Sequence, residues 1–175
     1  PATTGALTFA SPATATSNVG SYAIDGSGLT ANNGNYLFVQ AASNATALTI
    51  NPATLLYLAD PKSRLYGDAN PALTGTVTGF KNSDTMATAT TGTLAFTTAA
   101  TPTSNVGSYG ILGSGLTTTT ANYVLAQDPS NATALTINPA TLTYIANPSS
   151  RLYGDPNPLF TGNVTGFKNS ETIAT

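Results

Sequence analysis

The amino-acid sequence predicts an all-β fold made of tandem repeats with an 87-residue period, arranged as an elongated rod or fibre. The first observation is self-similarity, because three segments recur 87 positions further on with no insertion or deletion. These pairs are Ser17–Tyr22 with Ser104–Tyr109, Asn44–Leu55 with Asn131–Leu142, and Arg64–Asp68 with Arg151–Asp155. The second is that runs rich in Thr, Val, Tyr and Ile lie between Gly, Pro and Asn clusters, without helical spacing of apolar residues. Repeats that contact only their neighbours build a quasi-one-dimensional array, which predicts the rod.

The composition indicates a folded chain with an uncharged polar surface. Hydrophobic residues make up 41% and aromatic residues 8% of the chain, whereas charged residues make up 7% and the net charge is −2. Such low charge is typical of secreted and cell-surface repeat proteins, so we expect an extracellular location. No basic patch is available to neutralise phosphates or anionic lipids, which argues against nucleic acid and membrane partners. No apolar run approaches the ~20 residues that cross a bilayer, so membrane insertion is not expected.

Two prolines mark the expected boundaries between repeats. Pro52 and Pro139 each separate two apolar β-like runs, and proline lacks the N–H that a central strand needs. We therefore predict one complete repeat at residues 51–137, the end of a preceding repeat at 1–50, and the start of a following repeat at 138–175. An alternative phasing starts the repeats at Gly5 and Gly92. The expected partners are neighbouring repeats of the same chain, and the two partial pieces are expected to pair with neighbouring chains or with each other across a filament contact.

The strands of each repeat follow in order from their composition. We predict strands at Leu7–Phe9, Tyr22–Ile24, Asn35–Gln40, Ala47–Ile50, Leu55–Ala59 and Thr74–Phe80, each with a counterpart 87 residues on. Alternate residues of a strand point to opposite faces. Leu, Tyr and Ala persist at 142, 144 and 146 while Leu56 becomes Thr143, so Leu55, Tyr57 and Ala59 are predicted to face the core.

The connections are predicted from turn residues. Asp25–Gly28 supplies positive-φ positions for a turn or bulge. Residues 31–34 and 118–121 are predicted to be hairpin tips. Residues 81–84 and 168–171 are candidates for a short helical turn capped by Asn or Ser.

Several motifs, in one order and at one spacing, then resemble a known family. The motifs are Tyr66–Pro71, Leu73–Asp84, Asn105–Tyr109, Asn122–Tyr123 and Leu135–Ile137. Together they resemble the MBG domain of the YGx type, which occurs in tandem arrays in large bacterial surface proteins similar to filamentous haemagglutinins and other adhesins exported by two-partner secretion. The resemblance implies a small, mostly β, β-grasp-like unit that repeats as a stalk or fibre on the bacterial surface or in a secreted protein. It carries no catalytic residues.

The YGD-x-NP segment is the most distinctive polar cluster. Its oxygen-bearing side chains are candidate Ca²⁺ ligands: Asp68, Asn70, Asp155 and Asn157. Calcium prefers six to eight oxygens, usually with several carboxylates, and only one acid is present in each copy. We therefore favour a structural turn, in which Gly67 takes a positive φ and Pro71 rigidifies the exit.

Three further features suggest modification or binding. Asn44, Asn131 and Asn163 each begin an N-x-Thr sequence and are candidate glycosylation sites, with unmodified residues the simpler interpretation. Lys81 and Lys168 are candidates for an isopeptide bond, against a simpler surface ion pair. Recurring tyrosines could form a platform for host or surface glycans, although tyrosine is also ordinary core material. They are Tyr22, Tyr36, Tyr57 and Tyr66 with Tyr109, Tyr123, Tyr144 and Tyr153.

The chain lacks His and Cys, so the usual catalytic triads and zinc sites are absent and we do not expect an enzyme. No catalytic or cofactor-binding residue is assigned. The sequence favours a structural stalk or fibre repeat of a bacterial extracellular adhesin or surface filament. The alternatives are a carbohydrate-binding repeat module that gives multivalent adhesion, and a spacer region of a secreted enzyme.

Overall fold

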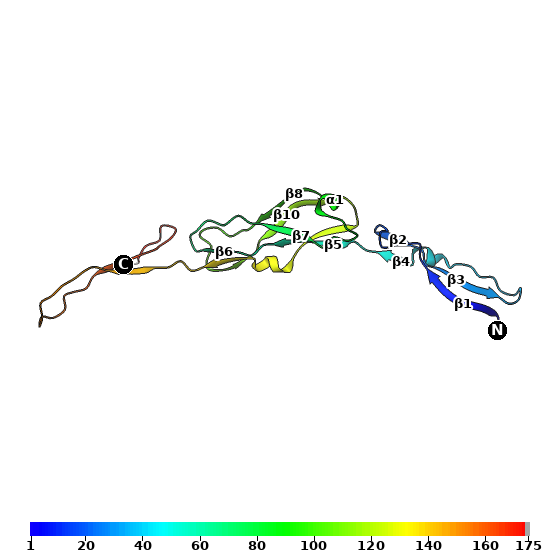
Figure 1. The fold of residues 1–175 in the computed structure, drawn as a ribbon, viewed down its shortest axis with the longest axis horizontal. Helices are drawn as coiled ribbons and strands as arrows, with labels where there is room; N and C mark the ends of the chain where they lie inside the picture. The colour runs from blue at the N-terminus through cyan, green and yellow to red at the C-terminus, as the bar shows by residue number, and fades with distance from the viewer. Residues whose placement is uncertain (174–175) are drawn as a thin grey trace. The chain divides into compact units, whose positions relative to one another are not determined.

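The computed structural model describes residues 1–173 and is mostly β, which confirms that part of the prediction (Figure 1). The first half holds β1 (Thr3–Ala10), β2 (Gly20–Tyr22), β3 (Asp25–Ala31), η1 (Ala42–Thr46), β4 (Leu48–Ile50), β5 (Ala53–Ala59), β6 (Lys62–Leu65), β7 (Gly75–Thr78) and α1 (Met86–Ala89). The second half holds β8 (Thr90–Thr97), β9 (Gly107–Tyr109), β10 (Leu112–Thr118), β11 (Tyr123–Gln127), η2 (Pro129–Thr133), β12 (Leu135–Asn138), β13 (Thr143–Ala146) and β14 (Gly162–Thr165).

Many elements have a counterpart at an offset of 87 residues. The pairs are β1 with β8, β2 with β9, β3 with β10, η1 with η2, β4 with β12, β5 with β13 and β7 with β14. The same offset relates two pairs of non-glycine residues with positive φ, Asn82 with Asn169 and Ser83 with Ser170. Equivalent sequence therefore takes equivalent local structure at both places.

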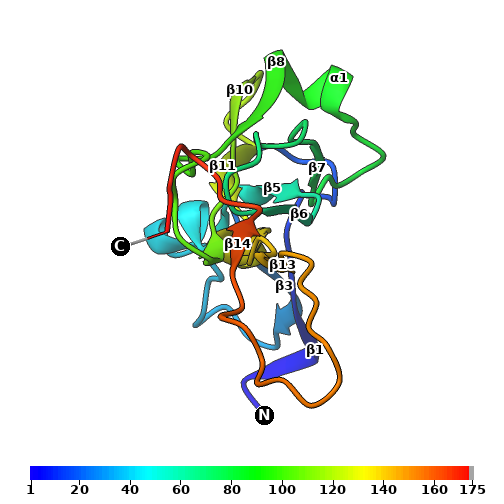
Figure 2. The same ribbon diagram turned by 90° about the vertical axis from the view of Figure 1, so that its left-hand side faces the viewer.

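The chain divides into two compact units, each with its own apolar cluster. Residues 1–56, 77–93 and 116–126 form the first unit, which contains the antiparallel pairs β1–β3 and β2–β4. Its cluster is Leu55, Ala89 and Tyr123. Residues 57–76, 94–115 and 127–175 form the second unit, of which residues 174 and 175 lie outside the described part. It contains the sheet β6-β12-β9, and its cluster includes Ile111, Leu135 and Ile137. It also contains the pair β13–β14, which Figure 2 labels.

Strand β5 confirms the predicted core face. Leu55, Tyr57 and Ala59 are buried, whereas the intervening Leu56 and Leu58 are only partly covered. The strand lies between β11 and β7 in a three-stranded sheet. Alternation in the sequence therefore identified which face packs inward.

The segment Asp25–Gly28 was predicted to form a turn or a bulge. Its bulge is confirmed, because the β1–β3 register shifts between Gly5 and Thr8 and Gly28 has a φ of +89°. All four residues lie in β3, so of the two predicted alternatives the segment forms the bulge and not the turn. Backbone crowding explains the glycine, since a Cβ at Gly28 would lie 2.0 Å from the Ala6 carbonyl oxygen.

One strand prediction and two hairpin predictions are wrong. Residues 36–40 are not a strand, although their counterparts form β11, because β11 pairs with β5 and no described strand pairs with residues 36–40. Residues 118–121 turn the chain, but no hairpin forms, because β10 pairs with β8 and β11 pairs with β5. The turn at 31–34 likewise leads into extended chain without strand pairing.

The predicted helical turn at 81–84 is also wrong. Asn82 and Ser83 have φ angles of 50° and 66°, which lie in the left-handed region and exclude a right-handed turn. The same holds at 168–171. The short helix α1 begins two residues later, where Thr85 and Thr88 form a capping box.

Candidate functional site

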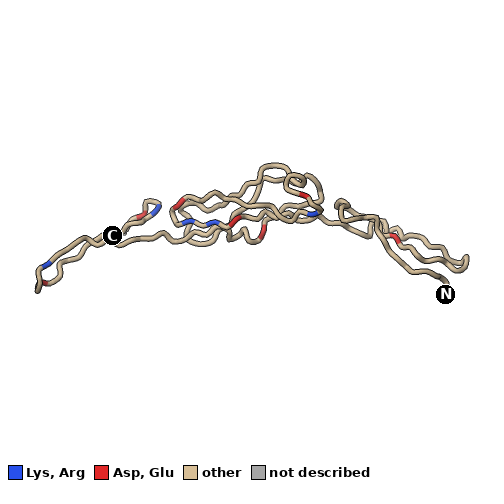
Figure 3. The backbone as a smooth tube through the Cα atoms, in the orientation of Figure 1, with Lys and Arg blue, Asp and Glu red and all other residues tan. Residues whose placement is uncertain are grey.

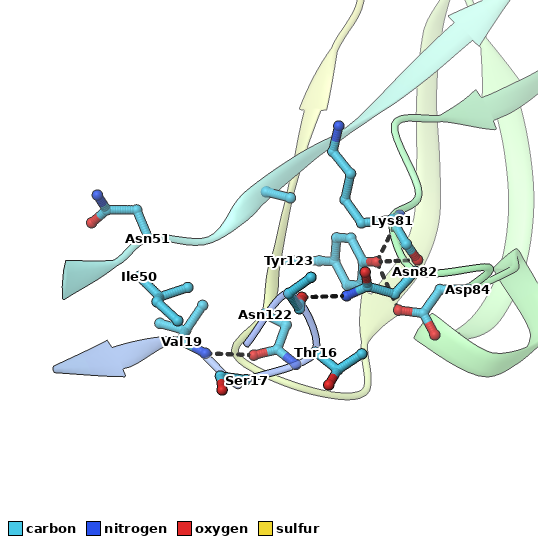
Figure 4. A pocket seen from close by; sticks show the side chains of 12 residues that line it. Thr16, Ser17, Val19, Ile50, Asn51, Lys81, Asn82, Asp84, Asn122 and Tyr123 are labelled. Carbon is cyan, nitrogen blue, oxygen red and sulfur yellow. Dashed lines mark hydrogen bonds between the residues drawn. The ribbon is translucent and has the colours of Figure 1, made fainter. Parts of the chain in front are cut away.

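The segments on either side of Pro52 enclose a small polar hollow within the first unit (Figure 4). It is lined by the loop 15–19, by residues 50–53, by the turn 81–84, and by Asn122 and Tyr123. Its volume is about 240 Å³, below the ~300–1,000 Å³ typical of small-molecule sites. We therefore treat it as a contact between chain segments, and we call these segments the first joint.

Asparagine side chains tie the first joint together. The Asn122 amide oxygen accepts the Val19 N–H at 2.8 Å, and its amide nitrogen donates to the Asn18 amide oxygen at 2.9 Å. The Asn82 amide nitrogen donates to the Ala15 carbonyl oxygen at 2.9 Å. The loop before β2 is thus held from two segments that lie far along the chain.

Tyr123 anchors the 81–84 turn. Its side chain is buried and its ring meets the Phe80 ring edge-on, with centroids 6.3 Å apart. The hydroxyl donates to the Asp84 carboxylate at 2.7 Å and accepts the Lys81 N–H at 2.9 Å. The turn therefore keeps the shape that presents Asn82 to Ala15.

The environment of Tyr123 stabilises the neutral phenol. Burial raises the pKa of the Tyr123 hydroxyl above its usual value of about 10, and the hydrogen bond and charge of Asp84 raise it further, against a smaller lowering by the Lys81 N–H. A raised folded-state pKa means that the stability contribution is complete below pH ~10 and is lost as the pH rises through the folded pKa.

We accordingly predict that alkali loosens the first joint. Above pH ~10 the stability of the first unit should fall because the unfolded chain releases the Tyr123 proton more readily than the folded chain does. Urea unfolding at a series of pH values between 8 and 12 measures this slope. Tyr123→Phe should flatten it, whereas Tyr36→Phe, at an exposed tyrosine, should leave it unchanged. Equal slopes for the wild type and Tyr123→Phe would contradict the assignment.

The segments around Pro139 form a second joint, within the second unit. The Asn169 amide donates to the Pro102 carbonyl oxygen at 3.3 Å. The Lys168 ammonium pairs with the Asp68 carboxylate at 2.8 Å, and the Tyr66 hydroxyl donates to the Glu171 carboxylate at 2.5 Å. Both members of the ion pair are over a third exposed, so it contributes only ~0–1 kcal/mol.

One contact recurs at both joints. Asn82 and Ala15 lie 87 residues before Asn169 and Pro102, and each asparagine donates its amide to the matching carbonyl. The acceptor is a backbone oxygen, so the bond survives the change from Ala to Pro.

A family model fits most of the chain that builds these joints. The model of the MBG domain (YGX type) matches residues 55–133 and 142–175, which include Tyr66–Asp68, both lysine–asparagine turns and Asn122–Tyr123. The chain belongs to this family. Comparison with curated proteins and with solved structures found no match. No helix within residues 1–173 combines the length and apolarity needed to cross a bilayer.

The YGX segment of the MBG domain is built as a turn. Gly67 takes the predicted positive φ of +84°, and the Asp68 N–H bonds to the Leu65 carbonyl. The Asp68 carboxylate faces Lys168, and Asn70 bonds Arg64 and Ala100. In the second copy Asn157 accepts from Arg151 at 2.8 Å, and the Asp155 N–H bonds to the Leu152 carbonyl.

The calcium prediction is not tested by this geometry. Within residues 1–173 no three acidic, His or Cys side chains gather as metal ligands, and Figure 3 marks the few charged residues along the backbone. The candidate oxygens that the structure describes at Asp68, Asn70 and Asn157 bond to cationic side chains.

Sequence reasoning missed the buried Arg64. Its guanidinium donates to the Asn70 amide oxygen at 2.7 Å and to the Thr101 carbonyl at 2.5 Å, and the Asn70 amide donates to the Ala100 carbonyl at 2.6 Å. The sequence feature that could have indicated this pairing is the separation of six residues between Arg64 and Asn70, which recurs between Arg151 and Asn157.

The three N-x-Thr asparagines lie in different surroundings. Asn163 is exposed on β14 and Asn44 is half-buried. Asn131 is 1% exposed, and its amide accepts the Ala59 N–H at 2.8 Å and donates to the Tyr57 carbonyl at 2.7 Å. Glycosylation of Asn131 would therefore have to precede folding. An isopeptide bond at Lys168 would need a buried carboxylate beside it, whereas the carboxylate that pairs with Lys168, that of Asp68, is 43% exposed.

The tyrosines fall into buried, half-buried and exposed groups. Tyr57 and Tyr123 are buried, and Tyr22, Tyr66 and Tyr109 are half-buried. Those half-buried hydroxyls donate to the Asn18 carbonyl, the Glu171 carboxylate and the Asn105 carbonyl. The expected core placement is confirmed for Tyr57 and is partial for Tyr22. The exposed set is Tyr36, Tyr144 and Tyr153.

Proposed function

We propose that this chain is a structural, non-catalytic segment of a bacterial extracellular adhesin or surface filament, in which tandem MBG domains with an 87-residue period stack into a stalk or fibre. The observation that carries the proposal is the contact shared by the two joints. Asn82 and its equivalent Asn169 each donate a side-chain amide hydrogen bond to an equivalent backbone carbonyl, that of Ala15 and that of Pro102.

A repeated joint sets a repeated orientation. When every repeat meets the next through equivalent contacts, the array extends with a constant step, and neighbour interfaces set its bend and twist. Asn82 and Asn169 lie in left-handed turns whose shape depends on local bonds, so the donor is positioned before the contact forms. We therefore favour a stiff stalk over a string of independently tumbling domains.

Two further observations support an extracellular role. Membership of the MBG family is consistent with a surface protein, and the 7% content of charged residues is unlike that of most cytosolic domains. Apart from location, the hollow at the first joint is smaller than a typical substrate site, which favours a structural role.

The glycan-binding alternative has less support from the tyrosines. The exposed ones are equivalent to covered ones: Tyr36 to Tyr123, Tyr144 to Tyr57, and Tyr153 to Tyr66. Their exposure thus reflects missing neighbours, and it does not indicate a sugar platform. Glycan binding stays a prediction from the sequence.

Solution scattering tests the stalk. A single compact body of 175 residues has a radius of gyration of ~16 Å, and stacked repeats should give a clearly larger value at low concentration. Small-angle X-ray scattering of the 175-residue chain measures this. A radius near 16 Å would mean one globular body and would sink the stalk proposal.

The shared asparagine contact is expected to stiffen the joints. We predict that Asn82→Gly with Asn169→Gly broadens the distribution of scattering dimensions, because glycine keeps the left-handed turn but removes the donor. Asn33→Gly, in an exposed turn of the first unit outside the first joint, is the matched control. Identical scattering profiles for the double variant and the wild type would mean that the asparagine bonds do not stiffen the joints.

A further inference from the structure

We propose that the 175-residue chain assembles head to tail, with residues 138–173 of one copy docking on residues 1–50 of a second copy by reciprocal strand addition. The proposal rests on the repeat equivalence that underlies the proposed function, and it names the partner. We call residues 1–50 the head and residues 138–173 the tail.

The second unit shows how an equivalent of the tail covers an equivalent of the head. Tyr57 lies directly on Gly113, where an added Cβ would come within 2.5 Å of the Tyr57 side chain. The Phe96 ring reaches Gly75 in the same way, with its Cζ 2.5 Å from a Cβ built there. Both glycines leave room for an aromatic ring from the other segment.

An amide clasp accompanies these ring contacts. The Asn131 side chain accepts the Ala59 N–H at 2.8 Å and donates to the Tyr57 carbonyl at 2.7 Å. Their counterparts are Asn44 in the head and Ala146 and Tyr144 in the tail. The head and the tail therefore hold the two halves of the two ring contacts and of the Asn131 contacts.

The head already has the local structure of its covered counterpart. Gln40 bonds both backbone groups of Gly26 at 3.0 and 2.7 Å, as Gln127 does to Gly113 at 2.9 and 2.7 Å. Its apolar side chains are nevertheless open to solvent, with Phe9 63% and Leu37 86% exposed. A preformed apolar surface of this kind loses little conformational entropy on docking.

A hollow marks the place on the head. It has a volume of about 350 Å³ and is lined by Leu7, Phe9, Gly26, Leu29 and Phe38, among others. The Phe9 ring lies 3.0 Å from a Cβ built at Gly26. Docking would turn this ring towards the tail glycine Gly162, as Phe96 turns towards Gly75, and would free Gly26 for Tyr144.

The tail is also preformed. Strands β13 and β14 pair over four residues, Asn147 bonds Thr161 at 2.8 Å, and Arg151 bonds Asn157 at 2.8 Å. Tyr144 is 88% exposed, whereas its counterpart Tyr57 is 5% exposed. The tail thus presents the ring that the head lacks.

Each partner lacks the strand that the other carries. Strand β12 pairs with both β9 and β6, whereas its counterpart β4 pairs only with β2. Strand β5 pairs with both β11 and β7, whereas its counterpart β13 pairs only with β14. The counterparts of β6 and β11, residues 149–152 and 36–40, are not strands.

Docking completes both sheets at once. Residues 149–152 of the tail would pair parallel to β4, in the register of Lys62–Leu65 with Leu135–Asn138, and residues 36–40 of the head would pair with β13. Open sheet edges are the usual sites of strand addition. The prediction of a strand at 35–40, which is wrong for the single chain, would be right in the assembled one.

Two variants that each block one end test the proposal. Tyr144→Asp disables the tail and leaves the head intact, and Phe9→Asp disables the head and leaves the tail intact. Both residues are mostly exposed in the single chain, so neither change should unfold it, and circular dichroism checks this. The measurement is molar mass by light scattering after size exclusion, over a concentration series.

The expected pattern is specific to head-to-tail docking. The wild type should form a ladder of multiples of 17.6 kDa that lengthens with concentration. Each blocked variant alone should stay monomeric, and the equimolar mixture should give a dimer of twice that mass and nothing larger. Leu112→Asp is the control, because the equivalent head residue is already Asp25, and it should assemble like the wild type.

Three results of the molar-mass measurement would overturn the proposal. They are a wild type that stays monomeric at all concentrations, folded blocked variants that still associate alone, and a mixture that stays monomeric. Scattering from monomeric Tyr144→Asp measures the stalk separately, so failure of docking and failure of the proposed function remain distinguishable. On docking, hydrogen exchange should slow at residues 36–40 and 149–152, and unchanged exchange in a dimer would exclude strand addition.

Discussion

Asn131→Ala is expected to lower the free energy of unfolding of the second unit by about 3 kcal/mol. The Asn131 side chain is fully buried, and its amide oxygen accepts the Ala59 N–H. Alanine removes this acceptor from a buried donor and also leaves a small void. The Tyr57 carbonyl keeps the Asp128 N–H at 2.9 Å, so the cost comes mainly from Ala59. Urea denaturation, with hydrogen exchange at residues 57–59, measures both effects.

The chain offers its own control at the equivalent position. In the single chain the half-buried Asn44 amide donates to Gln40 at 2.9 Å, so Asn44→Ala should cost less than ~1 kcal/mol. The two asparagines share an identical sequence from residue 44 to 55 and from 131 to 142, which leaves burial as the difference between them. Equal losses at Asn44 and Asn131 would contradict the assigned clasp.

This asparagine also shows what a sequence pattern leaves open. N-A-T describes Asn44 and Asn131 equally well, and it suggests glycosylation at both. The clasp depends on strand residues 72 and 74 positions away, which no local pattern reveals. The repeat itself held a hint, because a polar residue kept inside an unchanged twelve-residue segment is compatible with a buried structural role.

Local chemistry was sufficient where the decisive neighbours lie close in sequence. Alternation identified Leu55, Tyr57 and Ala59 as the buried face of β5, and the bulge near Gly28 followed from its glycines. Prediction from local sequence was wrong where a strand depends on a partner that is remote along the chain. Residues 36–40 have the composition of a strand, but they remain unpaired in the single chain because strand formation requires hydrogen bonds to a neighbour.

The prediction of a helical turn at residues 81–84 was wrong for a different reason. Lys, Asn, Ser and Asp suit a helix start as well as a left-handed turn. The left-handed turn forms at both 81–84 and 168–171, each closed by a local bond between the backbones of its first and last residues, so it belongs to this segment itself. The Ala15 carbonyl that accepts the Asn82 amide lies 67 residues away along the chain. The joint contact of Asn82 therefore became visible only with the fold, although its recurrence at Asn169 shows that it belongs to the repeat.

Gly79→Ala is expected to destabilise the first unit by more than ~3 kcal/mol, because two costs act together. Gly79 has a φ of +101°, which an L-residue adopts at a cost of ~1–2 kcal/mol. A Cβ there would also lie 2.3 Å from the Thr54 carbonyl oxygen, which β5 holds in place. Relieving that contact requires β7 and β5 to move apart beside the buried Leu55. Urea denaturation of the variant measures the sum.

Gly154→Ala separates the two costs. Gly154 has a similar φ of +91°, but nothing lies within 4 Å of a Cβ built there, so only the backbone cost of ~1–2 kcal/mol should appear. The difference between the two variants then measures the close approach of β7 to β5, which positions Phe80, Lys81 and the joint turn that follows. If Gly79→Ala cost no more than Gly154→Ala, the strands would be free to separate at this point. Strands free to separate would not fix the turn at residues 81–84, on which the proposed stalk depends.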